Sequence, residues 1–110
     1  MADIKRKYGP LALVTGASSG IGEQFARLLA QEGVDLIITA RRAQRLESLS
    51  RELQQLYSVN VTCVTCDLSD ALQVQTLIEA VRPREPGLIV SNAGYGVSKG
   101  EYLDIDIAEL

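Results

Sequence analysis

Histidine and tryptophan are absent from this 110-residue chain, and phenylalanine occurs once. With 46% hydrophobic and 23% charged residues, the composition is that of a globular protein, so the scarcity of aromatics indicates an aliphatic core in an α/β arrangement. Low-complexity runs are also absent, which argues against disorder. The length suits one compact domain but not a cofactor domain plus a separate substrate domain, so we expect a single domain over residues 1–110.

The chain also lacks an excess of positive charge and a long apolar run. Eleven basic against fourteen acidic residues give a formal net charge of −3, which provides no overall field to attract nucleic acid or an anionic membrane. No apolar run approaches the roughly 20 residues that cross a bilayer. Basic residues 5–7 followed by apolar residues 11–14 resemble a signal peptide, but the apolar stretch is too short. We therefore expect a cytoplasmic protein without a membrane span or a nucleic-acid partner.

The two cysteines, Cys63 and Cys66, have the C-x-x-C spacing of redox and zinc motifs. In an extended strand, however, residues three apart point to opposite faces and lie about 10 Å apart, beyond the roughly 7 Å limit for a disulfide. A thioredoxin-type motif needs its first cysteine at a helix start, and a chain without histidine cannot easily complete a zinc site. We interpret both cysteines as core thiols and expect no metal site.

Hydrophobic periodicity predicts alternating strands and helices. Short apolar or β-rich runs predict strands at residues 11–14, 34–39, 59–66 and 88–90. The apolar positions at helical spacing are Ile21, Phe25, Leu28 and Leu29, then Leu46, Leu49, Leu53 and Leu56, then Leu72, Leu77, Ile78 and Val81. Gly33 ends the first of these helices, and Ser69 or Asp70 is placed to cap the third.

The resulting order, β-α-β-α-β-α-β, predicts a doubly wound parallel sheet. Right-handed crossovers favour the strand order 3-2-1-4, in which the winding direction reverses between the first and fourth strands. Ligands of such sheets bind at the carboxyl ends of the strands beside this point. Residues 88–91 would form an edge strand without a blunting lysine or proline, so we expect the chain to form a homo-oligomer through that edge.

A glycine-rich segment, T-G-A-S-S-G-I-G at residues 15–22, joins the first strand to the first helix. Gly16 allows a sharp turn, Gly20 allows the backbone to approach a pyrophosphate without a Cβ, and Gly22 allows the helix to pack near the sheet. Free N–H groups at the helix start then face the anion. A flexible glycine turn is the alternative, but the position within a βαβ unit favours cofactor binding.

Together with Asp67-Leu68 after the third strand and Asn92-Ala93-Gly94 after the fourth, this loop resembles the signature of the short-chain dehydrogenase/reductase family. The resemblance implies a Rossmann-type fold and a hydride-transferring oxidoreductase. The cofactor-binding residues that it and the strand ends imply are Gly16, Ser18, Ser19, Gly20, Ile21, Gly22, Arg41, Arg42, Asp67, Leu68, Asn92, Ala93 and Gly94. Asp67 preceding a helix cap, or Asn92 to Gly94 as an ordinary turn, are the alternatives.

The end of the second strand indicates which nicotinamide cofactor binds. NAD-binding sheets usually carry an acidic residue there that binds the ribose hydroxyls, whereas Ala40 occupies that place here. Arg41 and Arg42 offer guanidinium groups suited to a 2′-phosphate, so we expect NADP(H). The alternative is that both arginines, or Arg42 alone, belong to a solvated first helical turn, and Arg41 is the stronger candidate of the two.

The resemblance also implies that the catalytic Ser, Tyr-x-x-x-Lys and Asn, together with a fifth strand, lie beyond residue 110. Tyr95 and Lys99 have the Tyr-x-x-x-Lys spacing, but that pair needs a helix, which Gly94, Gly96 and Gly100 disfavour. We therefore expect no catalytic residue within this chain. The leading hypothesis is the cofactor-binding half of an NADP(H)-dependent enzyme acting on a small carbonyl or alcohol substrate; the alternative is a stand-alone nucleotide-binding or regulatory module.

Overall fold

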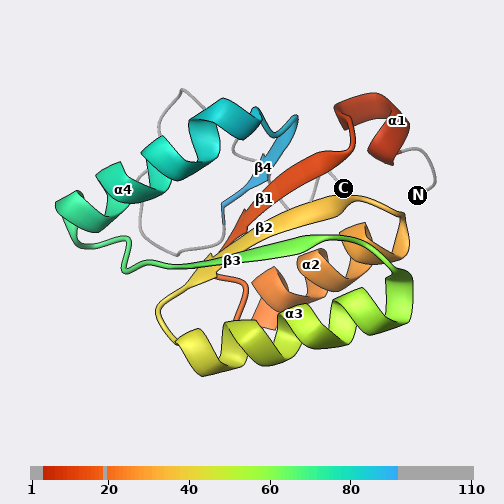
Figure 1. Cartoon of the computed structure of the whole chain (residues 1–110), viewed down its shortest axis with the longest axis horizontal. Helices are drawn as coiled ribbons and strands as arrows, with labels where there is room; N and C mark the ends of the chain where they lie inside the picture. The colour runs from red at the N-terminus through yellow and green to blue at the C-terminus, as the bar shows by residue number, and fades with distance from the viewer. Residues whose placement is uncertain (1–3, 19, 92–110) are drawn as a thin grey trace.

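The computed structural model of the protein describes residues 4–18 and 20–91, in which strands and helices alternate from β1 onward. The strands are β1 (Leu11–Thr15), β2 (Asp35–Ala40), β3 (Val61–Thr65) and β4 (Leu88–Val90). The helices are α1 (Ile4–Tyr8), α2 (Gly20–Gln31), α3 (Ala43–Tyr57) and α4 (Ala71–Val81), with the short 3-10 helix η1 (Arg82–Arg84) after α4 (Figure 1). The predicted alternation is confirmed, and α1 is an element that the sequence pattern did not predict.

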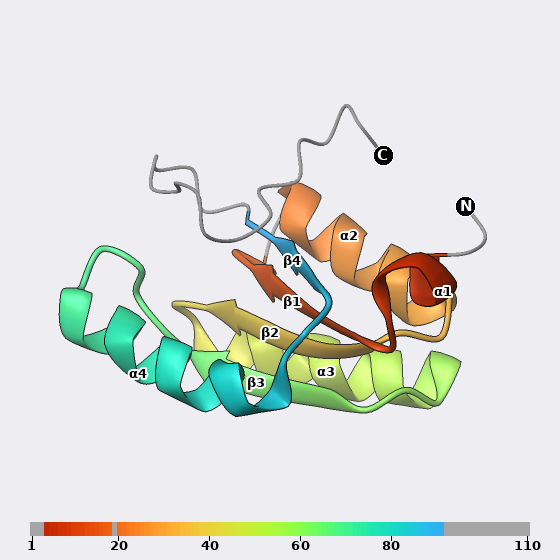
Figure 2. The ribbon, with the colours of Figure 1, turned by 90° about the horizontal axis from the view of Figure 1, so that it is seen from above.

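The four strands form one parallel sheet in the predicted order β3-β2-β1-β4 (Figure 2). β1 lies between β2 and β4, so that Val14 pairs with Ile38 on one side and with Val90 on the other. Because the strands are parallel, their carboxyl ends meet at one edge, toward the left in Figure 1. The strand order reverses between β1 and β4 at this edge, where doubly wound sheets bind their ligands.

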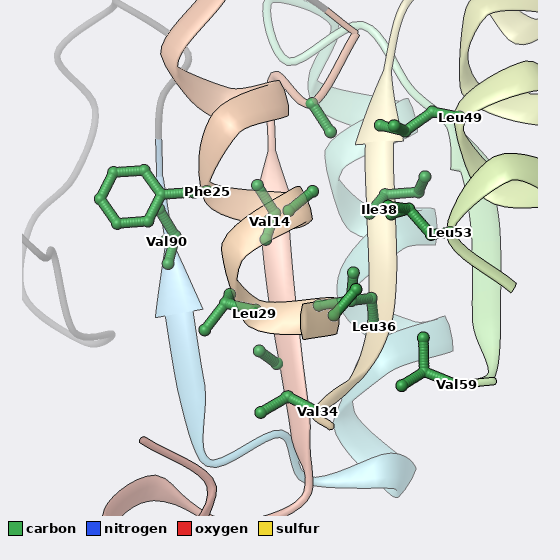
Figure 3. Close-up of a cluster of buried hydrophobic side chains, with 14 of the residues drawn as sticks. Val14, Phe25, Leu29, Val34, Leu36, Ile38, Leu49, Leu53, Val59 and Val90 are labelled. Atoms are coloured by element: carbon green, nitrogen blue, oxygen red, sulfur yellow. The ribbon is translucent and has the colours of Figure 1, made fainter. Parts of the chain in front are cut away.

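Helices cover both faces of the sheet, with α2 and α3 on one face and α4 on the other (Figure 1). The larger hydrophobic cluster fills the space between the sheet and the pair α2 and α3 (Figure 3). Leu36 and Ile38 of β2 are completely buried in it, against Leu29 of α2 and Leu53 of α3. This two-helix layer is the main hydrophobic contact that holds β2 in the centre of the fold.

The opposite face of the sheet carries a smaller cluster, in which Leu13 and Ile37 pack with Leu77 and Val81 of α4. Consecutive residues along β1, and likewise along β2, thus belong to different clusters, as expected for strands buried on both faces. The Asp70 side chain accepts hydrogen bonds from two backbone N–H groups in the first turn of α4, which confirms the predicted cap.

Two of the predicted apolar helix faces, those of α3 and α4, include residues that are exposed in the structure. Leu72 is 79% exposed, because the five residue steps from it to Leu77 turn an α-helix by about 500°, which leaves the two side chains on different sides. Ile78 lies at the margin of the buried face of α4 that carries Leu77, and it is also exposed. Leu56, at the end of α3, is exposed as well, and in this last turn Tyr57 packs against the core instead.

The two cysteines are free and serve opposite faces of the sheet, as the spacing argument predicted. Cys63 packs against the cluster under α2 and α3, whereas Cys66 belongs to the cluster under α4. Burial raises the pKa of both thiols. A raised pKa favours the thiol over the nucleophilic thiolate, as in structural cysteines.

Within the described residues, β4 pairs with β1 alone and therefore forms one edge of the sheet. Association of two copies through this edge stays a prediction. No helix in the described ranges combines the length and the apolar character needed to cross a bilayer.

The amino-terminal segment closes against the chain just before β4. Gly87 donates its N–H to the Leu11 carbonyl, and a Cβ built at Gly87 would overlap the Tyr8 carbonyl oxygen. Because the obstacle is backbone, it cannot be relieved by a change of rotamer. Gly87 is thus required by close packing of two chain segments, in contrast to glycines that are required by a positive φ.

We predict that Gly87→Ala lowers the free energy of unfolding by about 2 to 3 kcal/mol, because the added methyl group must displace the backbone near Tyr8. Urea denaturation followed by circular dichroism measures this change. Gln55→Ala, at an exposed position of α3, is the control and should change stability by less than about 0.5 kcal/mol. Equal stability of the two variants would contradict the packing argument.

Candidate functional site at the carboxyl edge of the sheet

Backbone hydrogen bonds align the loops that follow β1, β2 and β3. The Ala17 N–H donates to the Thr39 carbonyl at 3.1 Å, and the Cys66 N–H donates to the Ala40 carbonyl at 2.9 Å. The parallel ladder therefore continues beyond the strands themselves. As a result, the glycine loop and the Asp67 loop lie on either side of the end of β2, and these three sequence-predicted segments form one edge.

The glycine loop has the conformation that a close-approaching anion requires. Gly16 and Gly20 adopt positive φ values of 69° and 55°, a region that other residues avoid. A Cβ at Gly20 would meet nothing within 4 Å, so the missing side chain leaves open space at the start of α2. Gly22, in contrast, is buried where α2 packs on the sheet. This arrangement fits a pyrophosphate placed against the first turn of α2.

The other loop positions divide between exposed and undescribed residues. Ile21 is 48% exposed, so it points away from the core although it fits the helical apolar spacing. Ser18 is partly exposed. Ser19 lies outside the described residues, as do Asn92, Ala93, Gly94, Tyr95 and Lys99, so the predictions for them stay predictions.

The end of β2 carries no carboxylate. Ala40 is buried, and the exposed Arg41 and Arg42 follow it directly. Arg42 occupies the N-cap position of α3 without a side-chain capping bond, and neither arginine forms an ion pair with any described residue. Both guanidinium groups are therefore available to an anion at this edge.

Asp67 is held in a compact turn before α4. Its Oδ1 accepts hydrogen bonds from the Ser69 N–H at 3.0 Å and from the Ser69 hydroxyl at 2.7 Å, while its own N–H donates to Gln73. Its other carboxylate oxygen accepts no hydrogen bond within the described residues. The neighbouring Leu68 is partly buried against the cluster under α4. One carboxylate oxygen of Asp67 thus stabilises the turn, while the other remains available as a hydrogen-bond acceptor among the described residues.

Electrostatics connects Asp67 to the end of β2. The Ser69 hydrogen bonds lower the pKa of Asp67, and the positive charge of Arg41 lowers it further. Arg41 is therefore close enough to the Asp67 loop to affect the carboxylate, although the two form no ion pair.

The sequence pattern missed a charged groove between α2 and α3. Arg27 of α2 forms ion pairs with Glu23 at 2.7 Å and, across the two helices, with Glu52 at 2.8 Å. Hydrogen bonds to Glu52 and Glu23 raise the pKa of Arg27, and Arg27 in turn lowers the pKa of Glu52. Arg45 of α3 also approaches Glu23, at 4.0 Å. Only the i,i+4 spacing of Glu23 and Arg27 was visible in the sequence, since the other pairs depend on tertiary packing.

Metal chemistry has no support in the described part of the chain. No three or more acidic or cysteine side chains gather there in a way that could hold a metal ion. The available groups are backbone amides, guanidinium groups and one carboxylate, which together suit a phosphorylated organic ligand.

Comparison with known families and proteins gives a consistent result. The profile of the short chain dehydrogenase family matches residues 10–109. The chain is 31% identical over 94 residues to the inactive hydroxysteroid dehydrogenase-like protein 1 of Homo sapiens, covering 84% of this chain and 28% of that protein. It is 34% identical over 108 residues to the NADP-dependent 3-hydroxy acid dehydrogenase of Schizosaccharomyces pombe, covering 94% and 41%. The chain thus spans well under half the length of these relatives.

A solved structure with the same architecture is L-sorbose reductase from Gluconobacter frateurii, complexed with NADPH and L-sorbose. The TM-score is 0.73 at 33% sequence identity, and the match covers 83% of this chain and 35% of that one.

We predict that Ser69→Ala raises the pKa of Asp67 part of the way toward its ordinary value, because it removes the hydroxyl hydrogen bond but keeps the larger effect of the Ser69 backbone N–H. Arg41→Ala raises the pKa by a smaller amount, since the charge of Arg41 is the weaker cause. Because the pKa is lowered in the folded state, ionised Asp67 stabilises the fold above about pH 4, and this contribution is lost as the pH falls through the folded pKa. Carboxyl NMR chemical shifts during an acid titration measure both effects. Arg51→Ala is the control, and an equal shift in that variant would contradict the placement of Arg41.

Proposed function

Since the chain belongs to the short-chain dehydrogenase family, we propose that it is the NADP(H)-binding portion of an oxidoreductase that transfers hydride between nicotinamide and a carbonyl or alcohol substrate. One observation carries the cofactor assignment. At the edge where the glycine loop lies, β2 ends in Ala40 without a carboxylate, and the exposed Arg41 and Arg42, which form no ion pair with a described residue, follow. An acidic residue there would repel a 2′-phosphate, whereas two guanidinium groups attract it.

In this proposal the glycine loop holds the pyrophosphate through its backbone. The N–H groups at the start of α2 are the donors, and the open space at Gly20 allows the anion to approach them. Because Ala17 is hydrogen-bonded to the end of β2, the loop is in place before the ligand arrives. A preformed loop lowers the entropic cost of binding.

The adenosine end of the cofactor would lie between the ends of β2 and β3. Arg41 binds the 2′-phosphate, and the carboxylate oxygen of Asp67 that has no hydrogen-bond donor among the described residues accepts a hydrogen bond from the adenine amino group. Leu68 offers an apolar contact to the ring. Asn92, Ala93 and Gly94 complete the site next to the ribose by family resemblance.

The bound nicotinamide supplies the hydride, and the role of this chain is to hold and orient the cofactor. The substrate class is supported by relatives such as the L-sorbose reductase and the 3-hydroxy acid dehydrogenase, which are named for small carbonyl or hydroxy compounds. The chain is also similar to a protein named inactive, but the comparisons do not favour the alternative, a nucleotide-binding module without catalysis. Turnover of ketones with NADPH by a longer protein that contains this chain separates the two.

We predict that the chain binds NADPH more tightly than NADH and that Arg41→Ala lowers the ratio of the two affinities at least tenfold. A lost charge-assisted hydrogen bond is worth roughly 1.5 to 3 kcal/mol, and about 1.4 kcal/mol corresponds to a factor of ten. Fluorescence titration with both cofactors measures the ratio, with Arg51→Ala as the matched control. Equal affinities of the unmodified chain for NADPH and NADH would refute the cofactor assignment.

We also predict that the 110-residue chain alone shows no dehydrogenase turnover and that Tyr95→Phe changes nothing catalytic. The physical reason is that Tyr95 and Lys99 would need a helix to act together, and three nearby glycines disfavour one. Absorbance at the NADPH band in the presence of a ketone panel measures turnover. Turnover by the chain that Tyr95→Phe abolishes would show that this pair is catalytic.

A further inference from the structure

A surface groove of about 590 Å³ runs between α2 and α3 and reaches the glycine loop. Its lining includes Ser18 at the loop and Glu23 of α2, together with Arg45, Ser48 and Arg51 of α3. The groove therefore connects the start of α3 with the loop that is expected to hold the pyrophosphate.

Arg45 is the cation of this groove that is placed to serve the phosphate site. It is the third residue of α3, and long side chains of a helix extend toward its amino-terminal end, which here is the end of β2. Its side chain is 52% exposed, and its one ion pair, with Glu23, measures 4.0 Å, the outer limit of such a contact. Arg45 therefore loses little by turning to another anion.

Glu23 does not depend on Arg45. Its carboxylate accepts two hydrogen bonds from Arg27, at 3.0 and 2.7 Å, and Arg27 is also bound to Glu52 of α3. The connection between the two helices therefore persists when Arg45 moves. The weak contact with Glu23 thus holds Arg45 near the glycine loop. The stronger contacts of Arg27 with Glu23 and Glu52 maintain the groove.

Arg41 and Arg45 both lie near the end of β2. Arg41 directly follows Ala40, the last residue of β2, whereas Arg45 shares a groove with Ser18 of the glycine loop. A phosphate at the end of β2, beside the glycine loop, would have both guanidinium groups nearby.

We propose that Arg45 is a specificity-determining residue that binds the 2′-phosphate of NADP(H) from the side of the glycine loop, together with Arg41. Before binding, the weak contact with Glu23 holds Arg45 in the groove, and the phosphate takes the place of Glu23 as its partner. The inference rests on the proposed function and assigns a second cation to the same subsite. Hydrogen bonds from two guanidinium groups would fix the phosphate more tightly than those from one.

The test compares NADPH and NADH affinities by fluorescence titration in the complete chain. Arg45→Gln should weaken NADPH binding about fivefold, the amount expected of a half-exposed charge pair, and should leave NADH binding unchanged. Arg45→Lys should retain part of the affinity. Arg51→Gln removes an equal charge from the same groove, farther from the glycine loop, and should leave both affinities unchanged.

Glu23→Gln separates a direct contact from a structural role. If Arg45 binds the phosphate, removing its competitor leaves NADPH affinity unchanged or raises it. A loss of NADPH affinity in Glu23→Gln as large as that in Arg45→Gln would show that the pair only maintains the fold, and it would overturn the inference. So would equal effects of Arg45→Gln and Arg51→Gln, or no effect of Arg45→Gln in a chain that prefers NADPH. An unmodified chain without that preference would instead refute the proposed function.

Discussion

The candidate site depends on how the parallel ladder continues past the end of β2. Two carbonyl groups there, those of Thr39 and Ala40, accept hydrogen bonds from Ala17 and Cys66, which belong to the loops that follow the neighbouring strands. These bonds make the glycine loop and the Asp67 loop extensions of the sheet. Since backbone groups make them, the side chains at this edge remain available to a ligand.

The position of β2 is in turn determined by burial on both faces. Leu36 and Ile38 face α2 and α3, Ile37 faces α4, and none of the three is more than 1% exposed. A shift of this strand along the sheet would move Thr39 and Ala40 away from their partners and expose large apolar side chains to water. The hydrophobic core therefore sets the geometry of a polar site that lies outside it.

Local patterns predicted most of the fold, whereas features created by tertiary packing could not be predicted. The strand order follows from short buried runs and right-handed crossovers, and the turn at Gly16 follows from its neighbours in sequence. Leu72 was misplaced because an apolar residue in a helical window need not lie on the buried face. The requirement for Gly87 and the pairing of Arg27 with Glu52 depend on segments far apart in sequence, so no local pattern contains them.

The local distribution of charge matters more for the proposed ligand than the net charge of −3. Of the acidic groups near the end of β2, Glu23 is already engaged by Arg27, and Asp67 has a lowered pKa because Ser69 and Arg41 stabilise its ionised form. Arg41 and Arg45 are exposed at this edge, and the neighbouring acidic groups neutralise little of their positive charge. An acidic protein can therefore present a locally positive surface to a phosphate, because Coulomb interactions between exposed charges weaken beyond about 8 Å at physiological salt. Because of this screening, only cations that the fold places directly at the site contribute to the preference for a phosphate.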